Sequence, residues 1–279
     1  MKRQERSVIF IYIFMTIFGL LMIYPLIWLF SASFKTNEEI FGSLNLIPSS
    51  WDWNAYREGW RGSGQYTFGL YFANTFKLVL PTVLFTVVSS AIVGYGFARF
   101  VFPLKNVFFS IMISTLMLPN AVIIIPRYIL FKNMDWLNSY NPFIVPSLFA
   151  SNAFFIFMMV QFFRGLPREL DESAKIDGCN SFMILVRILL PLSTPALISA
   201  AIFQFIWTWN DFFSSLIYIT SVKKFTIPLA LRMSLDNSVG VPWNQVLAMS
   251  VVAIIPCVLV FFLAQKYFVE GISTTGIKG

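Results

Sequence analysis

Four polar side chains recur at helical spacing inside an apolar part of the chain. They are Gln204, Thr208, Asp211 and Ser215. Spacings of four, three and four residues would place them on one face of a continuous helix. Asp211 has long apolar sequence on both sides, and an ionisable group at membrane depth is costly enough to indicate a function. The neighbouring polar and aromatic residues are Trp207, Trp209 and Asn210.

This polar stripe has two interpretations. Hydrogen-bonding side chains can bind the polar groups of a solute, and an aromatic ring can stack on an apolar face of it. The stripe would then line a substrate pathway. Alternatively, the same groups could hydrogen-bond to neighbouring helices and serve only packing.

Several kinds of chemistry are excluded by residue type. The sequence contains no histidine, which removes histidine-activated nucleophiles, histidine metal sites and histidine proton relays. The two cysteines, Cys179 and Cys257, have no metal-ligand spacing and predict no disulfide framework. No P-loop or dinucleotide glycine motif occurs. We therefore expect no catalytic residues, no metal site and no cofactor of the chain's own.

The composition is that of a membrane protein. Of 279 residues, 57% are hydrophobic and 12% are charged, and the mean hydropathy is +0.73, far from the balance of soluble proteins. A membrane-spanning helix needs about 20 apolar residues. Six uncharged runs meet this length: 8–34, 78–98, 106–126, 136–163, 188–210 and 237–265. We predict an all-α polytopic membrane protein with six transmembrane helices, in a single domain over residues 1–279.

Charges near the span ends predict the orientation. Lys2, Arg3 and Arg6 directly precede the first run, which favours a cytoplasmic N-terminus. Six spans return the C-terminus to the same side. Lys223 and Lys224 oppose this bias, so the prediction depends on the N-terminal cluster and the short inner loops. The net charge of +7 fits this topology and attraction to anionic lipid, and no basic face is patterned for nucleic acid.

Two polar segments are too long to be simple connectors, and long ordered loops usually carry function. The outer segment, 35–69, is rich in Trp, Tyr and Gly. It is either an interfacial aromatic belt or a docking surface for an extracytoplasmic partner. The inner segment is 164–187. In the second run, Thr86, Ser90 and Gly94 form a small-residue ridge that is typical of helix packing.

The inner segment predicts a helix-turn-helix. Pro167 suits a first helical position, and Gly178 can take the left-handed conformation that ends a helix. Acids gather near the positive end of the helix dipole: Glu169, Asp171 and Glu172. We predict one helix over 167–177 and a second over 182–190, capped by Asn180 or Ser181.

The first of these helices has a charged side and an apolar edge. Two i,i+4 ion pairs are predicted on the charged side: Arg168 with Glu172 and Asp171 with Lys175. The apolar edge consists of Leu170, Ala174 and Ile176. Since a solvated loop needs no such edge, we expect a partner against it.

The spacing in this segment resembles a known motif. Glu172, Ser173 and Ala174 are followed after three residues by Gly178, and later by "ILLP" at 188–191. This resembles the EAA motif of bacterial ABC-importer permeases, with Ser173 where that family usually has alanine. "PLSTPAL", "TWNDFF" at 208–213 and "QKYFVEGISTTGIKG" at 265–279 are similar to the smaller permease subunit of maltose-type carbohydrate transporters, so the resemblance extends over the whole chain.

The resemblance implies a division of labour. The inner helix would be a coupling helix seated in a cleft of a separate ATPase subunit, which binds ATP and Mg²⁺, and Glu172 would pair with a cation there. The implied coupling residues are Glu172, Ser173, Ala174, Asp177, Gly178, Leu190 and Pro191. The C-terminal tail, 267–279, would give the ATPase a second contact through Thr274, Thr275 and Lys278, or else be a frayed terminus.

The implied assembly has several partners. They are a second permease subunit in a heterodimer, two ATPase copies, an extracytoplasmic solute-binding protein, membrane lipid and a sugar or oligosaccharide, in the cytoplasmic membrane of a bacterium. The alternative is a gradient-driven secondary transporter of a small polar solute, which Asp211 only partly supports because inverted repeats are absent. An intramembrane enzyme would need a nucleophile–base pair that the sequence does not offer.

Overall fold

The computed structural model describes residues 2–62, 65–236 and 240–276, with side chains from residue 8 to residue 266 in those ranges. Every regular element in the described ranges is a helix, which confirms the predicted all-α class. The chain folds as two compact units, Met1–Leu70 with Ala230–Ile255 and Tyr71–Leu229 with Pro256–Gly279.

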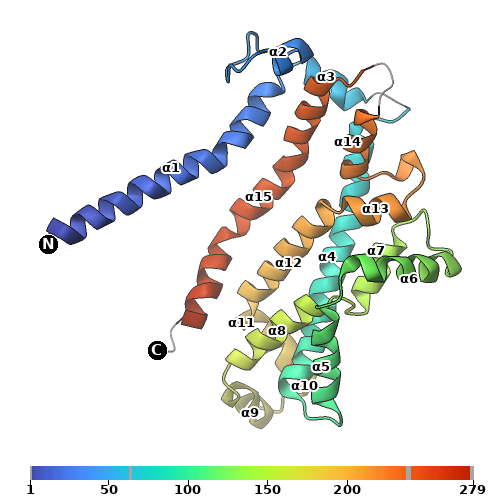
Figure 1. Ribbon diagram of the computed structural model, residues 1–279. Coiled ribbons are helices and arrows are strands. Elements are labelled where there is room, and N and C mark those ends of the chain that lie inside the picture. The colour runs from blue at the N-terminus through green and yellow to red at the C-terminus, as the bar shows by residue number, and fades with distance from the viewer. Residues whose placement is uncertain (1, 63–64, 237–239, 277–279) are drawn as a thin grey trace. The chain divides into compact units, whose positions relative to one another are not determined.

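The first unit contains an apolar helix and the outer segment. Its elements are α1 (Lys2–Ala32), α2 (Asn37–Gly42), α3 (Asn54–Arg61), the end of α14 (Ile227–Leu235) and the first part of α15 (Trp243–Gly276) (Figure 1). Almost every side chain of α1 from residue 8 to residue 30 is exposed, as an apolar surface for lipid or another chain would be.

The outer segment 35–69 is ordered by aromatic contacts. The ring of Phe34 lies 5.0 Å from Trp51, 4.9 Å from Trp53 and 5.3 Å from Tyr56, measured between centroids. The hydroxyl groups of Tyr56 and Ser33 are 2.7 Å apart. Burial raises the pKa of Tyr56, and the hydrogen bond with Ser33 partly opposes this. Trp51 and Trp53 remain more than half exposed, so the segment presents an aromatic surface.

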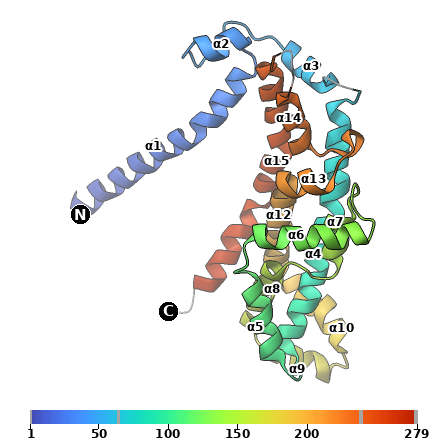
Figure 2. The ribbon, with the colours of Figure 1, turned by 45° about the vertical axis from the view of Figure 1, so that its right-hand side comes forward.

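The second unit is a helical bundle (Figure 2). Its elements are α4 (Phe68–Arg99), α5 (Lys105–Thr115), α6 (Asn120–Asn133), α7 (Asn141–Leu148), α8 (Ala153–Gly165), α9 (Glu169–Ile176), α10 (Ser181–Ile184), a π-helical turn (Leu185–Leu189), α11 (Leu190–Leu192), α12 (Thr194–Trp209), α13 (Phe212–Tyr218), a 3₁₀ turn (Val222–Lys224) and the start of α14. The helix α9 lies at one end of this bundle, beside α10.

Within the described ranges, four helical segments are long and apolar enough to cross a membrane: Val8–Ala32, Phe68–Arg99, Asn141–Gly165 and Trp243–Lys266. Two more candidates are bent, α5 with α6 by 103° and Ser181–Leu192 with α12 by 78°. If each bent pair is one span, the six predicted spans are recovered in order. The third and fifth spans are then each bent.

Proline explains the first of these bends. Pro119 is the N-cap residue of α6, and a proline disfavours helical conformation in the residue before it while lacking an N–H of its own. The helix that begins at Lys105 therefore stops before Pro119 and restarts in a new direction.

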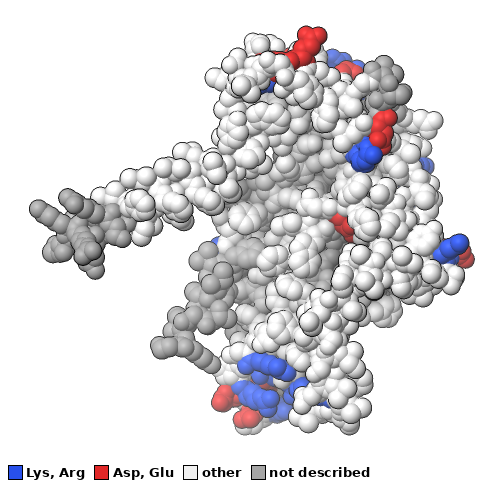
Figure 3. Space-filling view, viewed as in Figure 1, with Lys and Arg blue, Asp and Glu red and all other residues white. Residues whose placement is uncertain are grey.

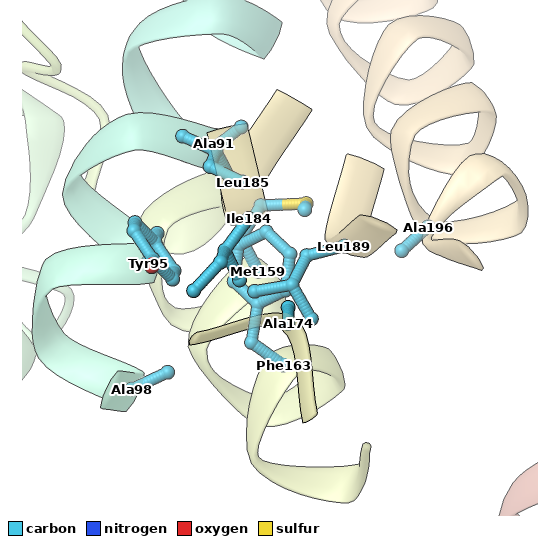
Figure 4. Close-up of a cluster of buried hydrophobic side chains, with 10 residues drawn as sticks. All are labelled: Ala91, Tyr95, Ala98, Met159, Phe163, Ala174, Ile184, Leu185, Leu189 and Ala196. Atoms are coloured by element: carbon cyan, nitrogen blue, oxygen red, sulfur yellow. The ribbon is translucent and has the colours of Figure 1, made fainter. Parts of the chain in front are cut away.

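A buried cluster joins α9 to the bundle (Figure 4). Its members come from α4, α8, α9, α10, the π-helical turn and α12: Ala91, Tyr95, Ala98, Met159, Phe163, Ala174, Ile184, Leu185, Leu189 and Ala196. The helices α4 and α8 approach closely at Gly94, where an added Cβ would lie 2.7 Å from the Cβ of Met159. The packing interpretation of the small-residue ridge is confirmed at this glycine.

Candidate functional site

The helix α9 is defined at both ends by its own sequence. Its first turn carries three acids, which the helix dipole favours there. At its C-terminal end, Gly178 N–H donates to Lys175 O over 3.0 Å and Cys179 N–H donates to Ala174 O over 2.9 Å. This is a Schellman motif, with Gly178 at φ +82°. The predicted helix is confirmed, although it begins at Glu169 and Pro167 precedes the N-cap residue instead of opening the helix.

An ion pair fixes α9 to the end of α4. Arg99 Nε lies 3.0 Å from Asp171 Oδ2, and the two side chains are only 7% and 13% exposed. Arg99 Nη2 also donates to Leu166 O over 3.1 Å. The predicted pairing of Asp171 with Lys175 was wrong, because Asp171 faces the bundle. The predicted pairing of Arg168 with Glu172 is not among the ion pairs of the described residues.

Burial separates the two faces of α9. Ala174 is 4% exposed within the cluster of Figure 4, whereas Ile176 is 86% exposed. The predicted apolar edge of Leu170, Ala174 and Ile176 was therefore wrong as a single surface, since Ala174 packs inward. The outward face consists of side chains that are exposed: Glu172, Ser173, Lys175, Ile176 and Asp177.

The chain returns from α9 through a widened helix. Asn180 Oδ1 accepts a hydrogen bond from Met183 N–H over 2.9 Å, which confirms one of the two predicted caps. Leu190 N–H then bonds to Leu185 O, closing a π-helical turn. Pro191 lacks an N–H and would clash with the carbonyl one turn earlier in an α-helix, and a π-helical turn accommodates this change. Leu190 is half-buried and Pro191 is exposed.

A cavity of about 480 Å³ lies within the second unit. It is bordered by α4, α6, α7, α12, α13 and the segments between them. Its polar lining includes Thr82, Thr86, Arg127, Asn152, Gln204 and Asp211. Two members of the predicted stripe, Gln204 and Asp211, thus line one cavity, and Thr208 and Ser215 are not part of its lining.

The polar stripe is not one helical face. The helix α12 ends at Trp209 with Asn210 as its C-cap residue, and Asp211 caps α13 by accepting a hydrogen bond from Ser214 N–H over 3.0 Å. An aspartate side chain competes for local backbone N–H groups in this way and so favours a helix start. The prediction of a continuous stripe through Asp211 was therefore wrong. Asn210 Nδ2 bonds back to Ile206 O over 2.8 Å.

Gln204 retains an unused acceptor. Its Nε2 donates to Thr208 Oγ1 over 2.7 Å. Its Oε1 is buried and has no hydrogen-bond partner among the described residues. A buried carbonyl without a donor costs free energy, so this oxygen needs a partner that the described residues do not supply. Ser215 is 2% exposed and lies in the packing of α13.

The two tryptophans of the predicted pathway lie in aromatic packing. Trp209 is 2% exposed, stacks on Phe205 at 5.3 Å and meets Phe76 at 4.9 Å between ring centroids. Trp207 contacts Phe154 and Phe155. Neither is in the cavity lining. The expectation that Trp209 presents a stacking surface to a sugar does not hold in this structure, because other rings occupy its faces.

The predicted tail contacts fall at the edge of the described chain. The backbone of α15 continues through Thr274 and Thr275 to Gly276. The side chains of these two threonines, and the whole of Lys278, lie outside the described residues.

Residues 90–274 match the family described as binding-protein-dependent transport system inner membrane component. The chain belongs to this family. It is 32% identical over 96% of its length to the probable ABC transporter permease protein YurM of Bacillus subtilis, of which 88% is covered. It is 32% identical, again over 96%, to the arabinooligosaccharides transport system permease protein AraQ of the same organism, of which 94% is covered.

Other similarities agree with this assignment. The permease is 33% identical over 92% of its length to the sn-glycerol-3-phosphate transport system permease protein UgpE of Pectobacterium atrosepticum, of which 93% is covered. It shares its fold, with a TM-score of 0.83 and 23% identity, with a chain of a bacterial ABC transporter that imports the acidic polysaccharide alginate, covering 96% and 98% of the two chains. The predicted function is confirmed: the chain is a membrane-spanning permease subunit of an ABC importer.

Two charged residues of this permease were not singled out by the sequence. Arg99 pairs with Asp171, and Arg127 lines the cavity. The sequence offered one signal for Arg99. It follows an apolar run on the same predicted side of the membrane as the acid-rich segment 164–187. No local pattern distinguishes Arg127 from other outer cations.

Proposed function

We propose that this permease forms half of the translocation path of an importer for a sugar or oligosaccharide, and that α9 transmits the motion of a separate ATPase. The observation that carries the proposal is the geometry of α9. The helix is fixed to α4 by the ion pair of Arg99 with Asp171 and keeps Glu172 exposed. A rigid helix with an exposed carboxylate can bind a cationic cleft and transmit force to α4.

The lining of the cavity supports a polyhydroxy substrate. Gln204 Oε1 offers a buried acceptor without a partner, which suits a substrate hydroxyl as donor. Asp211 and Arg127 add an acceptor and donors to the same cavity. Relatives named for arabinooligosaccharides and for sn-glycerol-3-phosphate are consistent with a substrate that carries several hydroxyl groups.

The assembly follows from the division of labour. A second permease completes a heterodimer, two ATPase copies bind ATP and Mg²⁺, and this chain holds no cofactor. The complex lies in the cytoplasmic membrane of a bacterium, with both termini and α9 in the cytoplasm. The coupling contact includes Ser173, Asp177 and Gly178, and the tail with Thr274, Thr275 and Lys278 adds a second contact. The exposed Trp51 and Trp53 surface receives the solute-binding protein.

Reconstitution in vesicles tests this function. We expect sugar uptake that requires the second permease, the ATPase, ATP and the binding protein together. Glu172→Lys should reduce capture of the ATPase, since it reverses charge at the contact, and Glu172→Asp should preserve it. Uptake driven by an ion gradient without ATPase would instead establish the secondary transporter. Normal ATPase capture by Glu172→Lys would show that α9 couples through other residues.

A further inference from the structure

Cations gather at the end of the second unit where α9 lies (Figure 3). Three of them belong to different elements: Lys105 opens α5, Arg164 is in the last turn of α8, and Arg168 is the N-cap residue of α9. None of the ion pairs between described residues includes any of the three. The acids of α9 lie at the same end of the unit (Figure 3), but none of them is ion-paired with these three cations, so the group can still attract an anion.

The three cations converge on one place. Lys105 and Phe109 lie one turn apart on the same face of α5, and the guanidinium of Arg164 sits over the Phe109 ring at 5.1 Å from its centroid. Arg164 is therefore beside Lys105. Burial lowers the pKa of the Lys105 ammonium, and the charges of Arg164 and Arg168 lower it further. The ammonium donates to Phe100 O over 2.7 Å.

An exposed apolar surface begins directly beside these charges. Its members are Val101 at 92% exposure, Leu104 at 64%, Phe108 at 51% and Ile111 at 58%. Phe108 and Ile111 lie three residues apart on one face of α5, and with Leu104, the N-cap residue before them, they form the α5 stripe. The stripe runs away from the cations along a helix of the membrane-spanning part.

We propose that Lys105, Arg164 and Arg168 form a binding site for an anionic phospholipid, with its phosphate headgroup among the three cations and its acyl chains along the α5 stripe. The pairing of a cation cluster with a continuous apolar helix face matches the two halves of a lipid. An acidic protein surface would account for the cations but not for the exposed apolar stripe beside them. The site does not depend on which sugar is carried, although one of its cations, Arg168, belongs to α9.

Native mass spectrometry of the purified complex, from mixed phosphatidylglycerol and phosphatidylcholine vesicles, tests the site. Each cation near an anionic surface changes affinity about fivefold, or ~1 kcal/mol. The triple variant Lys105→Gln, Arg164→Gln, Arg168→Gln should therefore lose the preference for bound phosphatidylglycerol by on the order of a hundredfold. The control Arg57→Gln, Lys132→Gln, Lys223→Gln removes the same charge at exposed positions elsewhere and should keep the preference.

Each result decides the proposal. Loss of phosphatidylglycerol in the triple variant only, with the ATPase still bound, supports the lipid site. Equal retention in the triple variant and the wild type overturns it. Loss of the ATPase with phosphatidylglycerol retained also overturns it, since the cations would then serve a protein contact. Displacement by soluble glycerol phosphate at matched ionic strength would show that the acyl stripe contributes nothing, contrary to the proposal.

Discussion

Arg99 and Asp171 are the residues that hold α9 in place. Both side chains are almost fully buried, and removal of one member of a buried ion pair leaves the other charge without compensation. We expect Arg99→Leu or Asp171→Leu to destabilise the permease by about 3 kcal/mol, and the double variant by clearly less than either single variant. Thermal unfolding of the purified complex measures stability, and the ratio of ATP hydrolysed to sugar transported measures coupling.

The double variant separates structure from coupling. If Arg99 only stabilises the fold, the double variant should regain normal coupling together with its stability. If the ion pair also positions α9, the double variant should regain its stability but hydrolyse more ATP than the wild type for each sugar transported. Equal damage in all three variants would contradict the ion pair as a compensated unit.

Two glycines of α4 provide a matched test of close packing. An added Cβ at Gly94 would lie 2.7 Å from Met159 Cβ, whereas at Gly96 it would meet nothing within 4 Å. We expect Gly94→Ala to cost about 1–3 kcal/mol through overpacking. Gly96→Ala should stabilise the helix by up to about 1 kcal/mol, because alanine favours helix over glycine. Opposite shifts of the unfolding temperature would verify the contact of α4 with α8, and a shift of the same sign for both would refute it.

At the scale of the element, the end of α9 depends on one backbone angle. Gly178 has φ +82° with no atom within 4 Å of an added Cβ, so a substitution there costs only backbone strain. We expect Gly178→Val to cost about 1–2 kcal/mol and to disorder the turn, which lowers ATPase-coupled transport while membrane insertion persists. Gly178→Asn should preserve transport, since asparagine adopts this conformation more readily. Loss of transport in both variants would point to a contact at this position instead of the turn.

The elements that were predicted correctly are those encoded by nearby residues. The acids after Pro167 and the glycine at 178 defined α9, and uncharged runs located the spans. The pairing of Arg99 with Asp171 was missed because it joins residues far apart in sequence. The prediction of one continuous polar stripe failed at Asp211, because the preference of aspartate for a helix N-cap outweighs the helical periodicity of the four polar residues. Burial of Trp209 depended on phenylalanines from α4, which no local pattern reveals.

At the scale of the whole molecule, the cavity makes the proposed path testable by chemical access. Gln204 and Asp211 line it, whereas Ser215 is buried outside its lining. In a background with Cys179 and Cys257 replaced by serine, Gln204→Cys and Asp211→Cys should react with a small hydrophilic thiol reagent. Ser215→Cys lies in α13, outside the lining of the cavity. It should react at least about tenfold more slowly, because a thiol buried there is both inaccessible to the reagent and less ionised.

Substrate protection then assigns the cavity to transport. Sugar delivered by the binding protein to the assembled complex should slow labelling at positions 204 and 211, because a sugar in the cavity would occupy the same space as the reagent. The reaction at position 215 should not change, which controls for a general closure of the complex. If assembly with the ATPase slows labelling and sugar has no effect, Gln204 and Asp211 serve helix packing and do not contact the substrate. The substrate contacts would then belong to the second permease, and Gln204 would need a donor from that subunit.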